Sequence, residues 1–226
     1  VGDGGFSYSI NNDKKINFTD SQLDFNDVGI YSYLSKGLYN NAHRGLYGIV
    51  LSGEENSDDY TGFRNPNNIV VLNNTNLTAS VAFYTNTSSL DVQLNNKSHV
   101  KADTLAYVAK EDAYTKLYSN NSTLEGDLIR EHDNLNPESN SLDVILANNS
   151  VLTGGSSQTN SINIDESSVW NVKALASDDG VYNSNVNELA NHGTVNLADK
   201  VATSTSYVPN RVEVKGNYIG SPDKNS

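Results

Sequence analysis

The sequence predicts an all-β protein, a right-handed, single-stranded parallel β-helix that spans residues 1–226. Three observations support this prediction. Short stretches alternate apolar and polar residues, as half-buried β-strands do. Polar breaks rich in Asn, Ser and Thr follow these stretches, and the combined motif recurs about every 24 residues. A period of this length is typical of one coil of a parallel β-helix, in which two or three short strands are joined by corners.

The motif recurs along most of the chain. It reads apolar-x-apolar, then Asn, Asp, Ser or Thr, then x-apolar, and its copies lie at 16–25, 69–81, 90–102, 115–126, 142–154, 162–172 and 186–197. The last small residue of a break marks each copy from the second onward, which gives Thr75, Ser98, Ser122, Ser150, Ser168 and Gly193. The spacing of these markers is irregular around its mean. Recurrence of one motif favours the β-helix over the alternative, an antiparallel β-sandwich.

The Asn-rich breaks are the predicted corners. Asn tolerates the left-handed backbone region, and its side chain can hydrogen-bond to its own backbone. In a stacked fold each strand lies about 4.8 Å from its equivalent in the next coil. We therefore expect Asn residues of successive corners to lie above one another and to form a ladder of side-chain hydrogen bonds.

Two segments depart from the simple repeat. The long interval between Ser21 and Thr75 leaves room for one further coil around 45–51 and for a long loop insertion at about 51–68. The segment 103–118 has some features of an amphipathic helix, but two strands on either side of the turn KEDA fit its pattern better.

Composition and charge restrict the kinds of partner. The formal net charge is −12 and the sequence pI is about 4.6, so nucleic acid and anionic membrane surfaces should repel the chain. A cationic or neutral partner suits it better. The chain has no Cys, which excludes disulfides, and no apolar run approaches the ~18 residues of a membrane span. It also has no Met, so we expect it to be part of a longer protein.

Three motifs follow one another in the C-terminal part: SSVWNV at 167–172, SNVNELANHGTVNL at 184–197 and VEVKGNYIG at 212–220. Together they resemble the C-terminal coils of the passenger domains of pertactin-like autotransporters. The matching residues are Trp170, Val186, Leu189, Gly193, Thr194, Val195, Gly216, Asn217, Tyr218 and Gly220. The close resemblance covers about 162–220. Residues 1–161 resemble the family only in having coils with corners rich in Asn, Ser and Thr.

The resemblance implies export by a Gram-negative bacterium across its outer membrane, with the passenger at the cell surface or secreted. The chain then corresponds to the C-terminal part of a passenger, without the end hairpin region and the translocator barrel. Its lack of Cys fits this route, because a disulfide-closed loop is too wide to thread through the barrel. No membrane insertion by this part of the protein is expected.

No catalytic or metal-binding constellation stands out. Some autotransporter passengers are serine proteases with a Gly-Asp-Ser-Gly loop, but the nearest text, VGDGG at 1–5, has no Ser in the nucleophile position. The four histidines show no metal-pair spacing; they are His43, His99, His132 and His192. We therefore predict that the chain is not an enzyme and that it uses neither a cofactor nor a metal ion.

Loops that leave the scaffold are the predicted binding surfaces. The contact residues come from the stretches 39–48 and 51–68, and they are His43, Arg44, Tyr60, Phe63 and Arg64. Aromatic residues together with Arg are typical anchors of protein interfaces. A third stretch at 130–139 could flank them. The alternative is a solvated insertion whose aromatic side chains fold back onto the coils.

The sequence therefore predicts an adhesin or host-receptor ligand that binds a host-cell surface protein or glycan. Self-association between bacterial cells through the polar corners is one alternative, and a polysaccharide-degrading β-helix enzyme is another. A groove with at least three convergent carboxylates, or with a carboxylate and an Arg, across neighbouring coils would favour the enzyme. A flat polar face with protruding loops would favour binding.

Overall fold

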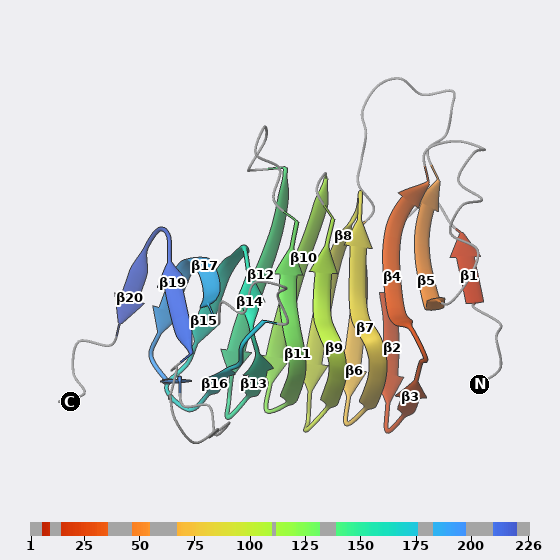
Figure 1. The fold of residues 1–226 in the computed structure, drawn as a ribbon. Helices are drawn as coiled ribbons and strands as arrows, with labels where there is room; N and C mark the ends of the chain where they lie inside the picture. The colour runs from red at the N-terminus through yellow and green to blue at the C-terminus, as the bar shows by residue number, and fades with distance from the viewer. Residues whose placement is uncertain are drawn as a thin grey trace, which may run out of the picture.

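The computed structural model describes residues 6–9, 15–35, 47–54, 67–109, 112–131, 139–175, 183–197 and 210–220. Within these ranges the chain forms β-strands and no helix, and the strands lie in two sheets (Figure 1). Every pairing between these strands is parallel. The predicted parallel β-helix is thus confirmed, and the antiparallel sandwich is excluded.

We name the sheets by their position in Figure 1. The front sheet contains eleven strands: β1 (Phe6–Ser9), β3 (Gln22–Asp24), β4 (Val28–Ser35), β5 (Tyr47–Glu54), β7 (Asn76–Asn86), β9 (His99–Val108), β11 (Thr123–Arg130), β13 (Val151–Gly154), β14 (Ser156–Ser157), β16 (Val169–Val172) and β18 (Thr194–Asn196). The back sheet contains nine: β2 (Lys15–Thr19), β6 (Asn67–Asn73), β8 (Ser89–Asn95), β10 (Ala113–Asn120), β12 (Asn140–Ala147), β15 (Thr159–Ile164), β17 (Asn183–Asn191), β19 (Arg211–Val214) and β20 (Tyr218–Gly220).

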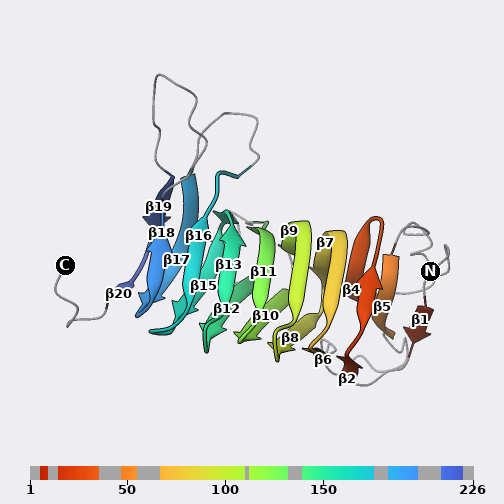
Figure 2. The same ribbon diagram turned by 90° about the horizontal axis from the view of Figure 1, so that it is seen from below.

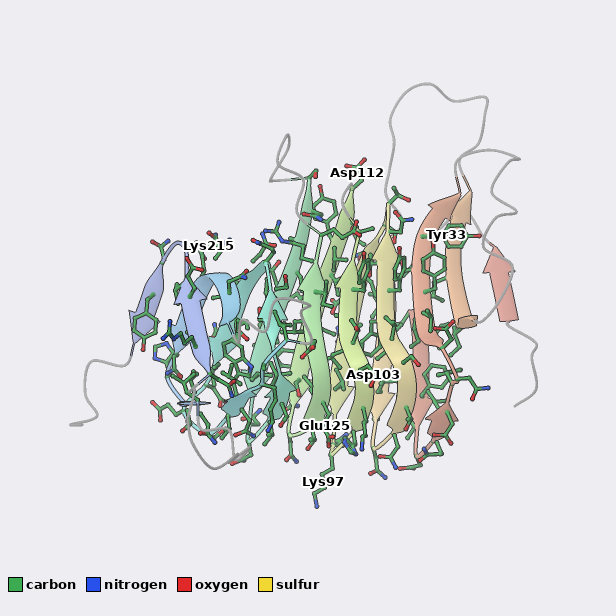
Figure 3. All side chains as sticks on the ribbon, viewed as in Figure 1. Tyr33, Lys97, Asp103, Asp112, Glu125 and Lys215 are labelled. Atoms are coloured by element: carbon green, nitrogen blue, oxygen red, sulfur yellow. The ribbon has the colours of Figure 1, made fainter. Side chains whose placement is uncertain are left out.

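The coil is right-handed, as predicted. Lys97, before β9, lies at the bottom of Figure 3, and Asp112, after β9, lies at the top, so the front strand β9 runs upward. The chain then descends through β10 in the back sheet while it advances toward the C-terminus. Figure 2 shows the two sheets from below, with the front-sheet strands above the back-sheet strands. Seen along the direction of advance, this path turns clockwise.

The interior is filled by rows of apolar side chains that lie one above another. The longest front-sheet row is Leu23, Leu77, Val100, Leu124, Leu152, Trp170 and Val195. The facing row in the back sheet is Ile16, Val70, Val92, Leu117, Val144, Ile162 and Leu189. All but the first and last members of the front row and the first of the back row are buried. Burying one such side chain stabilises the fold by roughly 1.5–3 kcal/mol.

Short corners join the back-sheet strands from β2 to β17 to the front-sheet strands that follow them, and we call this side of the solenoid the tight edge. Seven non-glycine residues there have a positive φ: Asp20, Asn74, Asn96, Lys97, Asn121, Asn148 and Asn149. Five of the seven are Asn, which adopts this conformation at lower cost than most residues because its short polar side chain hydrogen-bonds locally. The predicted role of Asn at the corners is confirmed.

Two ladders run along the tight edge. The predicted Asn ladder is present on the outside, where Asn148 Nδ2 donates to Asn120 Oδ1 at 2.8 Å and Asn120 Nδ2 donates to Asn95 Oδ1 at 3.3 Å. A second ladder of buried hydroxyl groups lies inside it. The backbone N–H of Thr75 donates to Ser98 Oγ at 3.1 Å, and that of Ser150 donates to Ser168 Oγ in the same way at 3.1 Å.

The opposite side, which we call the variable edge, joins front-sheet strands to the back-sheet strands that follow. Two residues separate β7 from β8, and four separate β9 from β10. Nine residues separate β11 from β12. The segment 103–118 contains the end of β9 and most of β10, so the prediction of two strands is confirmed.

The predicted extra coil around 45–51 is wrong. The back-sheet strands β2 and β6 pair directly, with Ile16 opposite Val70, so no coil lies between them. The segment instead forms β5, which pairs with β4 on the side away from β7 and also pairs with β1. The periodicity finds strands but does not show on which side of an earlier strand each one stacks. Residues 51–54 of the predicted loop insertion belong to β5, and 67–68 belong to β6.

Candidate binding face

Four tyrosines lie together on the outer face of the front sheet. Tyr31 and Tyr33 come from β4, Tyr84 from β7 and Tyr107 from β9. The register aligns Tyr31 with Tyr84 and Tyr84 with Tyr107, so these three form one row across neighbouring strands. In-register parallel strands place equivalent side chains about 4.8 Å apart, which brings the rings into contact. Figure 3 shows Tyr33 at the N-terminal side of the face, on β4.

The rings form a continuous stack, which we call the tyrosine stack. The ring centroids of Tyr84 and Tyr107 are 5.0 Å apart with planes at 4°, and those of Tyr31 and Tyr33 are 4.8 Å apart at 9°. Tyr31 and Tyr84, 5.0 Å apart at 57°, join the two pairs. Pairs at these separations attract each other beyond their burial of apolar area. Tyr31 is only 2% exposed, so the half-buried Tyr33, Tyr84 and Tyr107 form the accessible part of the stack.

A carboxylate fixes the hydroxyl at one end of the stack. Tyr107 donates its O–H to Glu131 Oε1, and the backbone N–H of Glu131 donates to the carbonyl of Val108 at 2.9 Å. Burial, then the hydrogen bond to Glu131 and its charge, raises the pKa of Tyr107 above the ordinary value for tyrosine. The hydroxyl therefore remains protonated over the physiological pH range and orients the carboxylate at the rim of the stack.

Two further carboxylates lie on the same sheet but nearer the tight edge, where the front-sheet strands bend. Asp103 is exposed on β9, and Asp127 is half-buried on β11. Burial raises the pKa of Asp127, as does the nearby charge of Asp103, although the Gly155 N–H opposes this by donating to Asp127 Oδ1 at 2.7 Å. Figure 3 shows Asp103 near the middle of the front sheet. We call the tyrosine stack with Asp103, Asp127 and Glu131 the candidate binding face.

The bend beside the face depends on a glycine. Gly126 has a φ of +136°, which L side chains rarely adopt. A Cβ on this residue would also lie 2.5 Å from the carbonyl oxygen of Ala102 on the neighbouring strand. The register between β9 and β11 shifts on both sides of Asp127, which marks a β-bulge. Bulges re-aim side chains, and this one sets the position of the Asp127 carboxylate.

The basic side chains of β9, His99 and Lys101, lie nearer the tight edge. His99 Nε2 and Glu125 Oε1 are 2.9 Å apart, and Glu125 is in register with Lys101. Figure 3 places Glu125 below Asp103, toward the tight edge. The described part of the face is therefore acidic at Asp103, Asp127 and Glu131 and mixed in charge next to the corners. A cationic group is the electrostatic complement of the acidic region.

A buried arginine closes the interior at the variable edge. Arg130 is 7% exposed and donates from Nε to the carbonyl oxygen of Gln158, and from Nη1 to Asn140 Oδ1 at 3.0 Å. Asn140 Nδ2 in turn donates to the carbonyl oxygens of Ala109 and Glu131. The sequence interpretation placed Arg130 at the start of a flanking loop, whereas its guanidinium points inward and bridges successive coils.

The predicted contact residues His43, Arg44, Tyr60, Phe63 and Arg64 lie outside the described residues, and their role stays a prediction. The sequence interpretation did not identify the tyrosine stack. A signal for it was present, because Tyr84 and Tyr107 each follow their corner markers by nine residues. Asp103 and Asp127 had no comparable signal, since a bulge sets their proximity.

Within the described ranges, no group of three His, Asp or Glu residues could hold a metal ion. A helix long and apolar enough to cross a membrane is likewise absent from that part of the chain. Comparison with protein-family models, curated proteins and solved structures finds no match to this chain. The resemblance to pertactin-like passengers therefore rests on the sequence motifs alone.

Proposed function

We propose that the chain is part of the passenger of a pertactin-like autotransporter and acts outside a Gram-negative bacterium as an adhesin or host-receptor ligand. The observation that carries this proposal is the candidate binding face, in which a tyrosine stack with Glu131 at one end shares the front sheet with two further carboxylates. Tyrosine supplies contact area and hydrogen-bonding groups with few rotatable bonds, and it is enriched at interface hot spots.

The C-terminal motif residues support the family assignment. Trp170 is fully buried, and its indole N–H donates to the carbonyl oxygen of Gly154 at 3.0 Å. A Cβ on Gly193 would lie 2.2 Å from the carbonyl oxygen of Asp165, so glycine is required at this corner. The motif thus contains residues that the coil geometry needs, as expected of a pattern that specifies coils.

Charge favours a basic partner. The chain carries a net charge of −12, and the candidate binding face carries three carboxylates, of which Glu131 contacts the tyrosine stack. A protein segment with Lys or Arg side chains could hydrogen-bond to the carboxylates and to the tyrosine hydroxyls. A neutral glycan is less well matched, because sugars stack on open aromatic faces and these ring faces are largely turned toward one another. We therefore propose a basic segment of a host-cell surface protein as the ligand.

The same geometry favours this function over self-association through the corners. The amide of Asn120 both donates to Asn95 and accepts from Asn148, so the Asn ladder uses its side-chain groups within the chain. A second molecule would have to displace these bonds in order to form its own. A basic group can approach the exposed carboxylate of Asp103 without breaking such a ladder.

The charge of the face provides the test. Fluorescently labelled protein is incubated with cultured epithelial cells, and bound protein is measured by flow cytometry at low and at high salt. We expect Asp103→Lys to lower the apparent affinity at least about tenfold, and we expect 0.5 M NaCl to weaken wild-type binding.

Asp91→Lys is the matched control, because Asp91 lies in register with Lys116 on the outer face of the back sheet. It changes the net charge by the same amount on the opposite side of the molecule. Equal binding by wild type, Asp103→Lys and Asp91→Lys would refute the role of the candidate binding face. Loss of binding only in a Tyr60→Ala/Phe63→Ala variant would assign recognition to the predicted loop instead.

A further inference from the structure

Strand β5 lies at a place that the regular solenoid does not require. In the front sheet it is flanked by β1 and β4, and it is parallel to both. Ser52 of β5 is in register with Ser9 on one side and with Tyr33 on the other. Val100 and Leu124 are in register on successive front-sheet strands, so their separation in sequence is the length of one coil. Ser9 and Tyr33 have the same separation. By this spacing β1 and β4 are successive strands of one solenoid, and β5 lies between them.

The segment that carries β5 also accounts for the one long interval in the repeat. Leu23 and Leu77 are in register, yet residues 36–66 and the rest of a full coil lie between them in sequence. Without 36–66, the interval from Leu23 to Leu77 would equal the interval from Leu77 to Val100 in the next coil. The excursion is therefore an insertion into an otherwise regular coil.

The ends of the excursion meet at one point of the repeat. Tyr33 is in register with Asn86, which puts Ser35 level with Ser88. Asn67, the first residue after the excursion, is in register with Ser89. Since Ser88 and Ser89 are adjacent in the chain, a direct link from 35 to 67 would reproduce the spacing of the next coil.

We propose that β5 is an inserted strand and that the front sheet has a second arrangement, in which β5 has left and β1 pairs directly with β4. In this arrangement Ser9 lies opposite Tyr33 instead of Ser52, and the parallel register of β1 is kept. Departure of β5 gives up two strand interfaces and regains one. The cost is one interface and the burial of Leu51, whereas the pairings of β2 with β6 and of β4 with β7 do not involve β5.

Gly48 controls how well β5 fits. A Cβ on this residue would lie 2.0 Å from Cδ1 of Phe25, and 2.9 Å from the carbonyl oxygen of Gly29 on β4. The Phe25 ring therefore occupies the space that any larger residue at position 48 would need. A substitution here should expel β5 without touching the coils that follow.

The consequence for binding rests on the proposed function, whereas the strand exchange itself does not. β5 divides the excursion in which the sequence predicts the contact residues, with His43 and Arg44 before it and Tyr60, Phe63 and Arg64 after it. Departure of β5 would therefore rearrange the strand that separates the two sets of predicted contact residues in the sequence.

Cysteine pairs distinguish the two arrangements, and the chain has no native Cys to interfere. A disulfide requires Cα atoms about 4.4–6.8 Å apart, which adjacent parallel strands meet and strands one further apart do not. The pair Ser9→Cys/Ser52→Cys reports β5 in place, and the pair Ser9→Cys/Tyr33→Cys reports β1 on β4. We expect the first pair to oxidise promptly in the intact chain and the second to oxidise slowly.

Two changes should shift the front sheet toward the arrangement in which β1 pairs with β4. Removing 36–66 so that Ser35 is joined to Asn67 should make the Ser9→Cys/Tyr33→Cys pair oxidise at least tenfold faster, and Gly48→Val should do so in the intact chain. Gly154→Ala is the control for general destabilisation, because its Cβ would also lie 2.0 Å from a neighbouring atom, the carbonyl oxygen of Gly126. It should lower stability without speeding oxidation of that pair.

The deletion variant decides the proposal. Its circular dichroism and cooperative unfolding show whether the solenoid has folded. A folded deletion variant that does not form the Ser9→Cys/Tyr33→Cys disulfide would overturn the proposal, as would an unfolded one. An intact chain in which this pair never oxidises, even with Gly48→Val, would also overturn it. Cell binding is not read out, so these results are independent of the proposed ligand.

Discussion

The two edges of the solenoid reverse the direction of the chain in different ways. At the tight edge, most turns reverse the chain in a few residues with a left-handed Asn, Asp or Lys, and a buried hydroxyl follows. At the variable edge, connections differ in length, and Arg130 with Asn140 forms a polar plug at one of them. The tight edge thus fixes the register of the stack. The variable edge tolerates insertions, and the contact residues predicted from the sequence fall between β4 and β6 in the sequence.

Gly193→Ala should break the tight edge most severely. Its Cβ would lie 2.2 Å and 2.4 Å from the carbonyl oxygens of Asp165 and Ser168, which are backbone atoms held by the preceding corner. We expect a loss of roughly 3 kcal/mol or more in the free energy of unfolding, measured by urea denaturation. A change below about 0.5 kcal/mol would show that the corner shifts freely.

Ser98→Ala should remove one step of the hydroxyl ladder. Ser98 Oγ accepts from the Thr75 N–H at 3.1 Å and lies 3.0 Å from the carbonyl oxygen of Leu72, to which it can donate. Losing these bonds leaves buried backbone groups unsatisfied, at a cost of about 1–3 kcal/mol in unfolding free energy. Ser141→Ala, on the half-buried outer face of β12, is the control and should stay within about 0.5 kcal/mol of wild type.

Arg130→Lys should weaken the hydrogen bonds that bridge successive coils at the variable edge. A lysine keeps the positive charge but cannot hold Gln158 and Asn140 with the fixed fork of a guanidinium. We expect a loss of roughly 1–2 kcal/mol in unfolding free energy. If Arg130→Lys were as stable as wild type, charge alone would explain the arginine, and the bridging geometry would be unnecessary.

Two carboxyl groups should give opposite pH effects of small size. Partial burial would raise the pKa of Asp165 at the tight edge, but hydrogen bonds donated by Asn148, Ser168 and Ser167 lower it overall. A lowered pKa stabilises the fold above the ordinary carboxyl pKa near 4, and this stabilisation is lost as pH falls toward the lower folded-state value. The pKa of Asp127 is raised, so its ionisation opposes folding as pH rises above 4.

Thermal melting between pH 3 and pH 7 tests both groups. Asp165→Asn should lower the Tm at pH 7 and lose this effect at the acid end. Asp127→Asn should raise the Tm slightly at pH 7 and have no effect near pH 3. Tm changes of the same sign for both variants at pH 7 would contradict the opposite pKa shifts of Asp165 and Asp127.

Some features of the molecule can be read from the sequence, and others depend on contacts that sequence does not encode locally. Asn at the corners is recognisable because few other residues adopt a left-handed backbone at low cost. The position of β5 is not recognisable, because parallel pairing offers two sides of β4 and the local pattern of β5 fits either. The tyrosine stack depends on the register between Tyr31 and Tyr84, which the inserted segment separates in sequence, while the bulge that positions Asp127 depends on Gly126.

Cell binding by tyrosine variants tests the central claim most directly. Tyr84→Ala/Tyr107→Ala removes the centre and one end of the tyrosine stack, and Tyr114→Ala/Tyr118→Ala removes two half-buried tyrosines from the outer face of the back sheet. At matched folded fractions, we predict that the first variant binds at least about tenfold more weakly than wild type and that the second binds normally. Equal binding by the two variants would contradict the assignment of recognition to the front sheet.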